Sequence, residues 1–239
     1  MIRALLFDLD DTLINTHESH GAAMDAAVRA AAAVHETVAA PTLAAAFHEA
    51  NTVVGRRLER GAQPATSQRE YRAAVFAEAL RELDLSPELA PELSAVYLEA
   101  RRGTHRLFED VEAALTRLAR RYHLILVTNG LSDLQREKVE SVQLGRWFSD
   151  VVVSGELQVW KPDPGIFHFA LSLAEVEVSE AVMIGDSLHH DIRGAGGVGM
   201  RSIWMRRYEH LAPQPEISPT AVLSDLHELD ICIDTWNND

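Results

Sequence analysis

The 239-residue sequence has little cysteine, no long apolar run and few positive charges. Its single cysteine, Cys232, cannot form an internal disulfide, so we expect a reducing, cytoplasmic location. No apolar stretch approaches the length that spans a bilayer. The first such stretch is interrupted by Asp8, which also argues against a secretory signal. These absences predict a globular protein with no membrane partner.

The charge balance is strongly acidic, with a formal net charge of −14 at pH 7. A nucleic-acid-binding surface normally shows a basic stripe, so we expect no nucleic-acid partner. The acidic balance does not exclude an anionic substrate, because local cations and a bound metal can override the global field. The hydrophobic content of 47% is normal for a globular core, and the length allows one large domain or two small ones.

The most informative stretch is the first apolar run and the turn that follows it. Residues 4–7 are apolar, and Asp8, Asp10 and Asp11 follow within four positions. Such a run predicts a strand buried on both faces of a parallel sheet, and these sheets bind ligands at the carboxyl ends of their strands. If the extended conformation persists, Asp8 and Asp10 share one side, so either one is protonated or a cation such as Mg²⁺ lies between them. A solvated acidic turn is the alternative.

Residues 17–102 contain no convincing strand and show helical periodicity throughout. The alanine-rich residues 22–38 predict one helix, and three more are expected at residues 41–60, 66–83 and from 86 onward. The predicted starts, caps and breaks are Pro41, Gly61, residues 63–65, Thr66 or Ser67, Ser86 and Pro87. We therefore expect a four-helix insertion at residues 16–105, inside an α/β domain made of residues 1–15 and 106–239.

Strands and helices alternate after this insertion. Strands are predicted at residues 123–127, 151–153, 181–184, 201–205 and 221–223, and helices at residues 109–121, 134–142, 166–174 and 192–197. This alternation implies right-handed crossovers and a Rossmann-like parallel sheet with helices on both faces.

Four polar clusters stand at or near the ends of predicted strands. They are Asp8, Asp10 and Thr12; Thr128 and Asn129; Lys161; and Asp186 with Asp191. The carboxyl ends of parallel strands share one edge, so these groups can converge there. Together they suit phosphoryl transfer, although each alone has an ordinary reading as a strand-to-turn exit, a surface charge or a helix cap.

The order of these clusters resembles the four motifs of the haloacid-dehalogenase-like (HAD) hydrolase superfamily. The matching motifs are Asp8-x-Asp10-x-Thr12, Thr128-Asn129, Lys161-Pro162 and Gly185-Asp186-(x4)-Asp191. The resemblance covers residues 1–15 and the chain from residue 108 onward, and the helical block matches the α-helical cap of the family. Residues 51–72 loosely resemble the cap of a subgroup that includes N-acylneuraminate-9-phosphatase and some pyrimidine 5′-nucleotidases.

The resemblance implies a Mg²⁺-dependent phosphatase that acts on a small phosphorylated metabolite through an aspartyl-phosphate. Asp8 would be the nucleophile, and Asp10 would protonate the leaving alkoxide and then activate water. The carboxylates of Asp8 and Asp186 and the backbone carbonyl of Asp10 would bind Mg²⁺.

The resemblance assigns the remaining motif residues to binding and support. Thr128 and the Asn129 N–H would bind phosphoryl oxygens, and Lys161 would lie near both the nucleophile and the phosphoryl group. Thr12 would buttress the first turn, and Asp191 would support the metal shell or Lys161.

The sequence departs from the family pattern at two turns. Asp11 stands where glycine usually follows the second aspartate, and Gln158 replaces a common glycine upstream of the large neighbour Trp160. These changes bear on the shape of the loops rather than on the chemistry. His189 and His190 lack acid or cysteine partners at metal-ligand spacing, so we expect both to be exposed rather than to bind a metal.

Four other functions share some of these features. A response-regulator receiver domain carries its acceptor aspartate on a later strand and its lysine last, an order that this sequence does not follow. A haloacid dehalogenase needs no metal and carries tyrosine at the position of Asp10. A phosphomutase stays open because it shares the core motifs, whereas a non-catalytic binding module is disfavoured because every catalytic position is filled. The substrate and the choice between monomer and homodimer stay open.

Overall fold

In the computed structural model, the apolar residues near the start of the chain form strand β1 (Ala4–Phe7), which is fully buried. The structure describes residues 1–34, 38–62, 66–208 and 212–238. Strand β1 pairs in parallel with β2 (His123–Thr128) on one side and with β4 (Ala181–Gly185) on the other. The first strand of the sequence therefore lies at the centre of the sheet.

The sheet has six parallel strands in the order β3-β2-β1-β4-β5-β6. The outer strands are β3 (Asp150–Val153), β5 (Arg201–Met205) and β6 (Ala221–Leu223). Because all strands run the same way, the turns after β1, β2 and β4 leave the sheet at one edge. The predicted Rossmann-like parallel sheet is confirmed.

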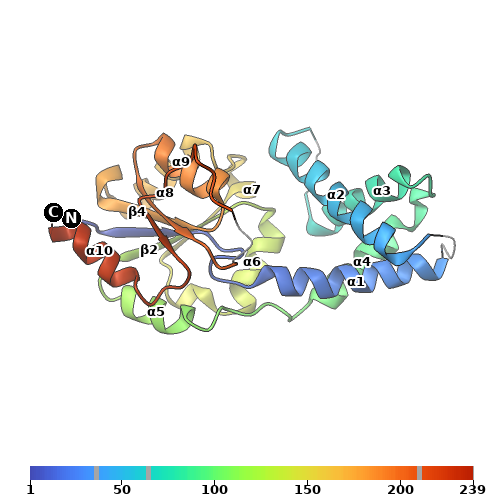
Figure 1. Cartoon of the computed structure of the whole chain (residues 1–239), viewed down its shortest axis with the longest axis horizontal. Helices are drawn as coiled ribbons and strands as arrows, with labels where there is room; N and C mark the ends of the chain where they lie inside the picture. Colours follow the sequence, from blue (N-terminus) through green and yellow to red (C-terminus); the bar gives the residue numbers. More distant parts are fainter. Residues whose placement is uncertain (35–37, 63–65, 209–211, 239) are drawn as a thin grey trace. The chain divides into compact units, whose positions relative to one another are not determined.

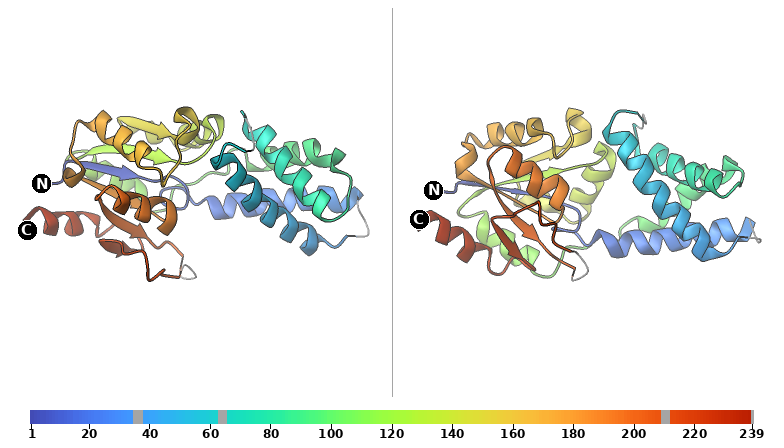
Figure 2. Two further views of the ribbon diagram at one scale, coloured as in Figure 1. Left: turned by 90° about the horizontal axis from the view of Figure 1, so that it is seen from above. Right: turned by 45° about the horizontal axis from the view of Figure 1, so that its top comes forward.

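Alternate residues of β1 enter different cores on the two faces of the sheet. Leu5 and Phe7 pack in one cluster with residues of α5 (Val111–Leu118) and α10 (Leu229–Asn238). Ala4 and Leu6 pack in the other with residues of α8 (Pro164–Ala174) and α9 (Arg193–Gly197). Helices cover both faces (Figures 1 and 2), which explains why the strand is continuously apolar instead of alternating.

The contacts divide the chain into two compact units, Met1–Asn15 with Arg106–Asp239, and Thr16–His105. The second unit is helical, with α1 (Thr16–Val34), α2 (Ala40–Glu59), α3 (Gln68–Glu82) and α4 (Ala90–Arg101). Its core includes Phe47, Phe76 and Tyr97, whose rings meet edge to face. The predicted insertion of helices into an α/β fold is confirmed.

Helix boundaries in this unit follow local chemistry. Ser67 caps α3 by accepting a hydrogen bond from the Glu70 N–H, and Ser86 caps a single 3₁₀ turn, Pro87–Leu89, that leads into α4. Helix α1 begins at Thr16, six residues earlier than predicted, and runs through Gly21, which a helix tolerates at a cost. The predicted break at residues 63–65 lies outside the described residues, as do residues 35–37 of the first predicted helix.

Several elements of the α/β unit differ from the prediction, including a short helix, α7 (Ser154–Leu157), where none was predicted. The helix expected at residues 192–197 starts earlier, because a π-helical turn, Leu188–Ile192, precedes α9. Ser187 begins this turn by accepting a hydrogen bond from the His190 N–H at 3.1 Å. Helix α10 was not predicted. Among the described residues, no helix has the length and apolar character needed to cross a bilayer.

Candidate active site

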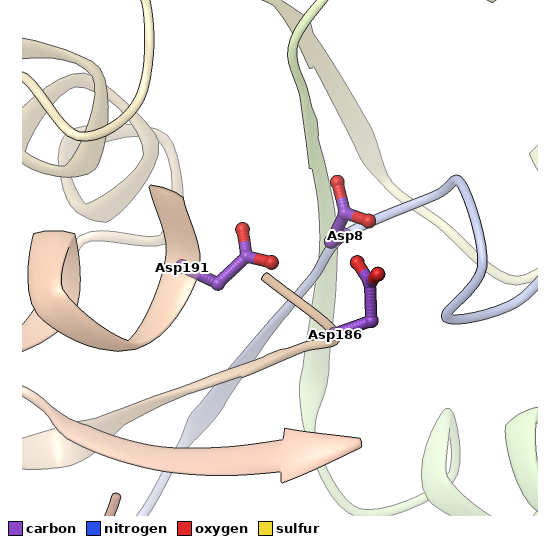
Figure 3. Close-up of side chains that lie close together, drawn as sticks. All are labelled: Asp8, Asp186 and Asp191. Carbon is purple, nitrogen blue, oxygen red and sulfur yellow. The ribbon is translucent and has the colours of Figure 1, made fainter. Parts of the chain in front are cut away.

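Three carboxylates meet at the carboxyl edge of the sheet (Figure 3). Asp8 directly follows β1, Asp186 directly follows β4, and Asp191 lies in the turn before α9. One carboxylate oxygen of each lies within 4.8 Å of the others. Since β1 and β4 are parallel neighbours, the fold brings together residues that are far apart in the sequence, as predicted from their placement at strand ends.

Lys161 joins this cluster as its buried cation. Its ammonium donates to Asp8 Oδ1 at 2.7 Å, to Asp191 Oδ1 at 2.7 Å and to the Val127 carbonyl at 2.8 Å. The side chain is only 1% exposed. Thr12 donates its hydroxyl to the second oxygen of Asp8 at 3.3 Å. Both oxygens of Asp8 are therefore held in place.

Burial and repulsion act together on the acids. Burial raises the pKa of Asp8 to about 7; Lys161 opposes this rise, whereas Asp191 and Asp10 add to it. The pKa of Asp186 is also raised, first by burial and then by Asp8 and Asp191. Burial alone would lower the pKa of Lys161, but Asp191 and Asp8 raise it above its ordinary value. The single positive charge of Lys161 therefore does not neutralise the three nearby carboxylates.

Such a cluster fits a divalent cation of the hard type. Its donors are carboxylate oxygens, which Mg²⁺ prefers, and a cation would relieve the repulsion that raises the pKa values of Asp8 and Asp186. Asp191 is the least accessible of the three acids: it is fully buried, and its oxygens accept hydrogen bonds from Lys161 and from the Ser187 N–H at 2.9 Å. Asp8 and Asp186 are therefore the side chains best placed to hold Mg²⁺.

Asp10 is held separately from the three acids. Its carboxylate accepts from the ammonium of Lys138 at 2.7 Å on each oxygen, and Oδ2 also accepts from Gln135 Nε2 at 3.0 Å. The same Gln135 amide donates to the hydroxyl oxygen of Thr128. Lys138 and Gln135 come from α6 (Ser132–Ser141), which follows β2 after a short turn. Asp10 and Thr128 are thus linked through one glutamine.

The sequence analysis missed Lys138 and Gln135. One signal could have identified the lysine, because the chain has only two lysines, Lys138 and Lys161, against twenty arginines. Both lysines are buried in this site.

Asn129 positions the loop that carries Lys161. Its side chain donates to the Lys161 carbonyl at 2.9 Å and accepts from the Lys161 N–H at 2.8 Å. This reciprocal pair of hydrogen bonds connects the end of β2 to that loop. The Asn129 side chain therefore has a structural role, in addition to the role predicted for the Asn129 backbone N–H.

These groups surround a cavity of about 280 Å³ within the α/β unit. It is lined by Asp8, Asp10, Asp11, Asn129, Lys161, Asp186, Ser187, His190 and Asp191. Thr12 and Thr128 are buried beside it and do not line it. The small volume and the polar lining suit a phosphoryl group and a metal ion.

His190 corrects one expectation. It was predicted to be exposed, but it is half-buried and lines the cavity, with Nδ1 3.2 Å from the Ser187 hydroxyl. Burial lowers the pKa of His190. His190 is half-buried because it lies in the π-helical turn, which the sequence pattern did not reveal. His189 is exposed as predicted.

The two departures from the family glycines leave the turns intact. Asp11 has φ +56° and Gln158 has φ +56°, the left-handed conformation that glycine adopts most easily. Asp11 tolerates this conformation better than most residues because its side chain is short and polar. Its carboxylate also accepts a long-range hydrogen bond from the Tyr208 hydroxyl at 3.1 Å. The backbone conformation therefore accounts for the usual glycine at each position.

Comparisons with known proteins agree with this geometry. Residues 2–199 match the family model of the haloacid dehalogenase-like hydrolases. A phosphoserine phosphatase from Thermus thermophilus is 35% identical over 95% of this chain and 98% of its own length. Human N-acylneuraminate-9-phosphatase is 29% identical over 95% of this chain and 92% of its own.

Solved structures show the same architecture across the whole chain. The magnesium-bound HAD-hydrolase YfnB from Bacillus subtilis has a TM-score of 0.77 and 25% identity, covering 98% of this chain and 99% of its own. A 2-haloacid dehalogenase from Pseudomonas syringae has a TM-score of 0.70 and 29% identity, covering 99% and 100%. By sequence and fold, this chain belongs to the haloacid dehalogenase-like hydrolases.

Proposed function

We propose that this chain is a Mg²⁺-dependent phosphatase that hydrolyses a small phosphate monoester through an aspartyl-phosphate on Asp8. The observation that carries the proposal is the separation of two carboxylates around one cavity. Asp8 is held by Lys161 and Thr12, whereas Asp10, two residues later, is held by a different cation. One acid can then attack phosphorus while the other handles protons.

In the proposed reaction, an Asp8 oxygen attacks phosphorus, and the bond between phosphorus and the ester oxygen breaks. Asp10 donates a proton to the departing alkoxide, then removes one from the water that hydrolyses the aspartyl-phosphate. Bound Mg²⁺, held by Asp8, Asp186 and the Asp10 carbonyl, would neutralise charge on the phosphoryl oxygens.

The remaining polar residues hold the phosphoryl group and the nucleophile. Lys161 balances charge beside Asp8, and Asp191 keeps that lysine in place at 2.7 Å. The Thr128 hydroxyl and the Asn129 N–H donate to phosphoryl oxygens. Thr128 is buried next to the cavity, and its hydroxyl oxygen accepts from Gln135, so the hydroxyl can still donate its proton toward the substrate.

The helical unit, Thr16–His105, is proposed to be a cap that closes over substrate and excludes bulk water. The stretches at residues 15–19 and 103–108 would act as hinges. Such a cap would select among small phosphorylated metabolites. We propose a cytoplasmic setting, consistent with the single cysteine.

Dehalogenase chemistry is the second candidate, because a 2-haloacid dehalogenase shares the fold at 29% identity. Attack on carbon with loss of halide needs neither a metal nor a proton for the leaving group. Asp10 would then have no leaving group to protonate and Asp186 no metal to hold, yet both line the cavity. Their presence favours phosphoryl transfer.

A panel of phosphate monoesters tests the proposal, assayed with Mg²⁺ and with chelator. It should include nucleoside monophosphates, sugar phosphates, O-phosphoserine and p-nitrophenyl phosphate, with 2-chloropropionate as the dehalogenase arm. We expect phosphate release that requires Mg²⁺. Undiminished turnover in chelator, or chloride release without phosphate release, would contradict the proposal, and phosphoryl transfer between hydroxyls of one sugar would indicate a phosphomutase.

A further inference from the structure

The group that holds Asp10 is more elaborate than a surface ion pair. The Lys138 side chain is 4% exposed, whereas that of Asp10 is 32% exposed. The ammonium donates to both Asp10 oxygens and to Gln135 Oε1, each at 2.7 Å. The Asp10 carboxylate is therefore held through both oxygens by a buried cation, while about a third of its side chain remains exposed.

Helix α6 is built to present these two side chains together. Gln135 and Lys138 are three positions apart, which puts them on one face of the helix. Gly130, in the turn before α6, has φ +150°, and a Cβ there would lie 2.8 Å from two carbons of the Gln135 side chain. Any larger residue at position 130 would push Gln135 away. The turn therefore leaves room for the glutamine.

We propose that Lys138, oriented by Gln135, is a positioning residue that holds the Asp10 carboxylate in the geometry for proton transfer. This inference rests on the proposed function, because it concerns a step of that reaction. Lys138 acts through Asp10 and does not touch the reacting atoms. Without it, the carboxylate would lose the contact that fixes both of its oxygens, and a small misplacement of a catalytic group costs rate steeply.

The choice of lysine fits this role. A chain with twenty arginines and two lysines uses lysine at both buried positions beside catalytic aspartates. Three acceptor oxygens around one nitrogen suit a compact ammonium, whereas the planar fork of arginine suits two oxygens side by side. A lysine ammonium therefore fits position 138 better than an arginine guanidinium would.

A double-mutant cycle tests the proposal with Lys138→Met, Asp10→Asn and the combined variant. Rapid-quench measurements would give the rate of phosphoenzyme formation from p-nitrophenyl phosphate and from O-phosphoserine, or from the best alkyl ester of the panel. We expect Lys138→Met to slow formation from the alkyl ester at least about tenfold, and from the aryl ester much less. In the Asp10→Asn background, the same substitution should change the rate less than about twofold, because its target is already lost.

Equal losses with both esters, or losses that multiply in the double variant, would overturn the proposal. The Arg136→Gln variant is the matched control on the same helix; Arg136 binds Glu156 and the Val151 carbonyl outside the site, so its ratio of alkyl to aryl rates should stay at the wild-type value.

If Lys138→Met does not fold, Lys138→Gln provides the same comparison, because it removes the charge beside Asp10 but keeps a polar side chain at this buried position. We expect a smaller loss with the same preference for the alkyl ester, and equal losses with both esters would again overturn the proposal. A wild-type enzyme that forms no phosphoenzyme from any ester would instead refute the proposed function.

Discussion

Asp8 and Asp10 are two residues apart, yet different ammonium groups hold them. Lys161 donates to Asp8 and Lys138 donates to Asp10, and the two lysines come from different segments of the α/β unit. Adjacent carboxylates with separate partners can perform separate tasks. The two aspartates should therefore respond differently to substitution.

The Asp10→Asn variant should separate the two steps of the reaction. It keeps the nucleophile and removes the group that donates and accepts the proton, a contribution of about 10²–10⁴-fold. Formation of the phosphoenzyme should slow more with an alkyl ester than with p-nitrophenyl phosphate, because an aryl oxide leaves without help. Breakdown should slow with both substrates. Rapid-quench kinetics would measure both steps, and equal losses in formation would mean that Asp10 is not the acid.

Stabilisation by Mg²⁺ should grow with pH. In the metal-free protein, burial raises the pKa of Asp8 to about 7 from an ordinary value of 3.8. Between pH 3.8 and pH 7, the folded state therefore binds a proton at Asp8 that the unfolded state has already lost. This proton favours the folded state at low pH, and its contribution to stability is lost as pH rises through 7. Mg²⁺ needs the ionised carboxylate, so protons compete with it below pH 7.

Thermal unfolding with and without excess Mg²⁺ would test this dependence. The increase in Tm caused by Mg²⁺ should be larger at pH 8 than at pH 6, and the Asp186→Asn control should show little increase at either pH. An increase that is independent of pH, or larger at pH 6, would contradict metal binding at these carboxylates.

At the scale of elements, α9 packs closely against α8 through a glycine. A Cβ at Gly194 would lie 2.6 and 2.7 Å from ring carbons of Phe167 and 3.2 Å from the Cα of Pro162. Phe167 is fully buried, so it has little room to move. Gly194→Ala should lower the free energy of unfolding by roughly 1–3 kcal/mol.

Gly196, on the same helix, is the matched control. It is exposed, and a Cβ there would meet nothing within 4 Å. Gly196→Ala should be neutral or stabilise the protein by up to about 1 kcal/mol, because alanine favours the helix. Urea unfolding of both variants would measure the difference, and similar stabilities would show that the approach of α9 to α8 is not as tight as described.

Elements with strong local signals were predicted well, and those set by long-range contacts were not. The apolar run of β1 predicted a central buried strand, and the four helices of the insertion follow from alanine content and caps such as Ser67. The earlier start of the turn at Leu188–Ile192 depends on contacts among Ser187, His190 and Asp191 that no periodicity reveals.

Site residues also differ in how far the sequence predicts them. Motif order predicted the convergence of Asp8, Lys161 and Asp186, because parallel strands end at one edge. Lys138 and Gln135 lie on a polar helix whose pattern resembles that of any solvated surface, so only the three-dimensional structure shows that both are buried.

In the whole molecule, closure of the proposed cap requires the two compact units to move relative to each other. A cap that closes over substrate would make the protein more compact when the site is filled. Small-angle scattering should show a smaller radius of gyration with Mg²⁺ and vanadate, which mimics the transferring phosphoryl group. Asp186→Asn should not respond. An unchanged radius in the wild-type protein would contradict closure.

Phosphoryl transfer to Asp8 is tested most directly by locating the phosphoryl group on the enzyme. The Asp10→Asn variant should accumulate the intermediate, because its breakdown lacks a base. After incubation with p-nitrophenyl phosphate and Mg²⁺ and then acid quench, mass spectrometry should find a phosphoryl adduct on Asp8. The adduct should be absent with chelator and absent from Asp8→Asn/Asp10→Asn. An adduct on another residue, or the same adduct formed in chelator, would contradict Mg²⁺-dependent phosphoryl transfer to Asp8.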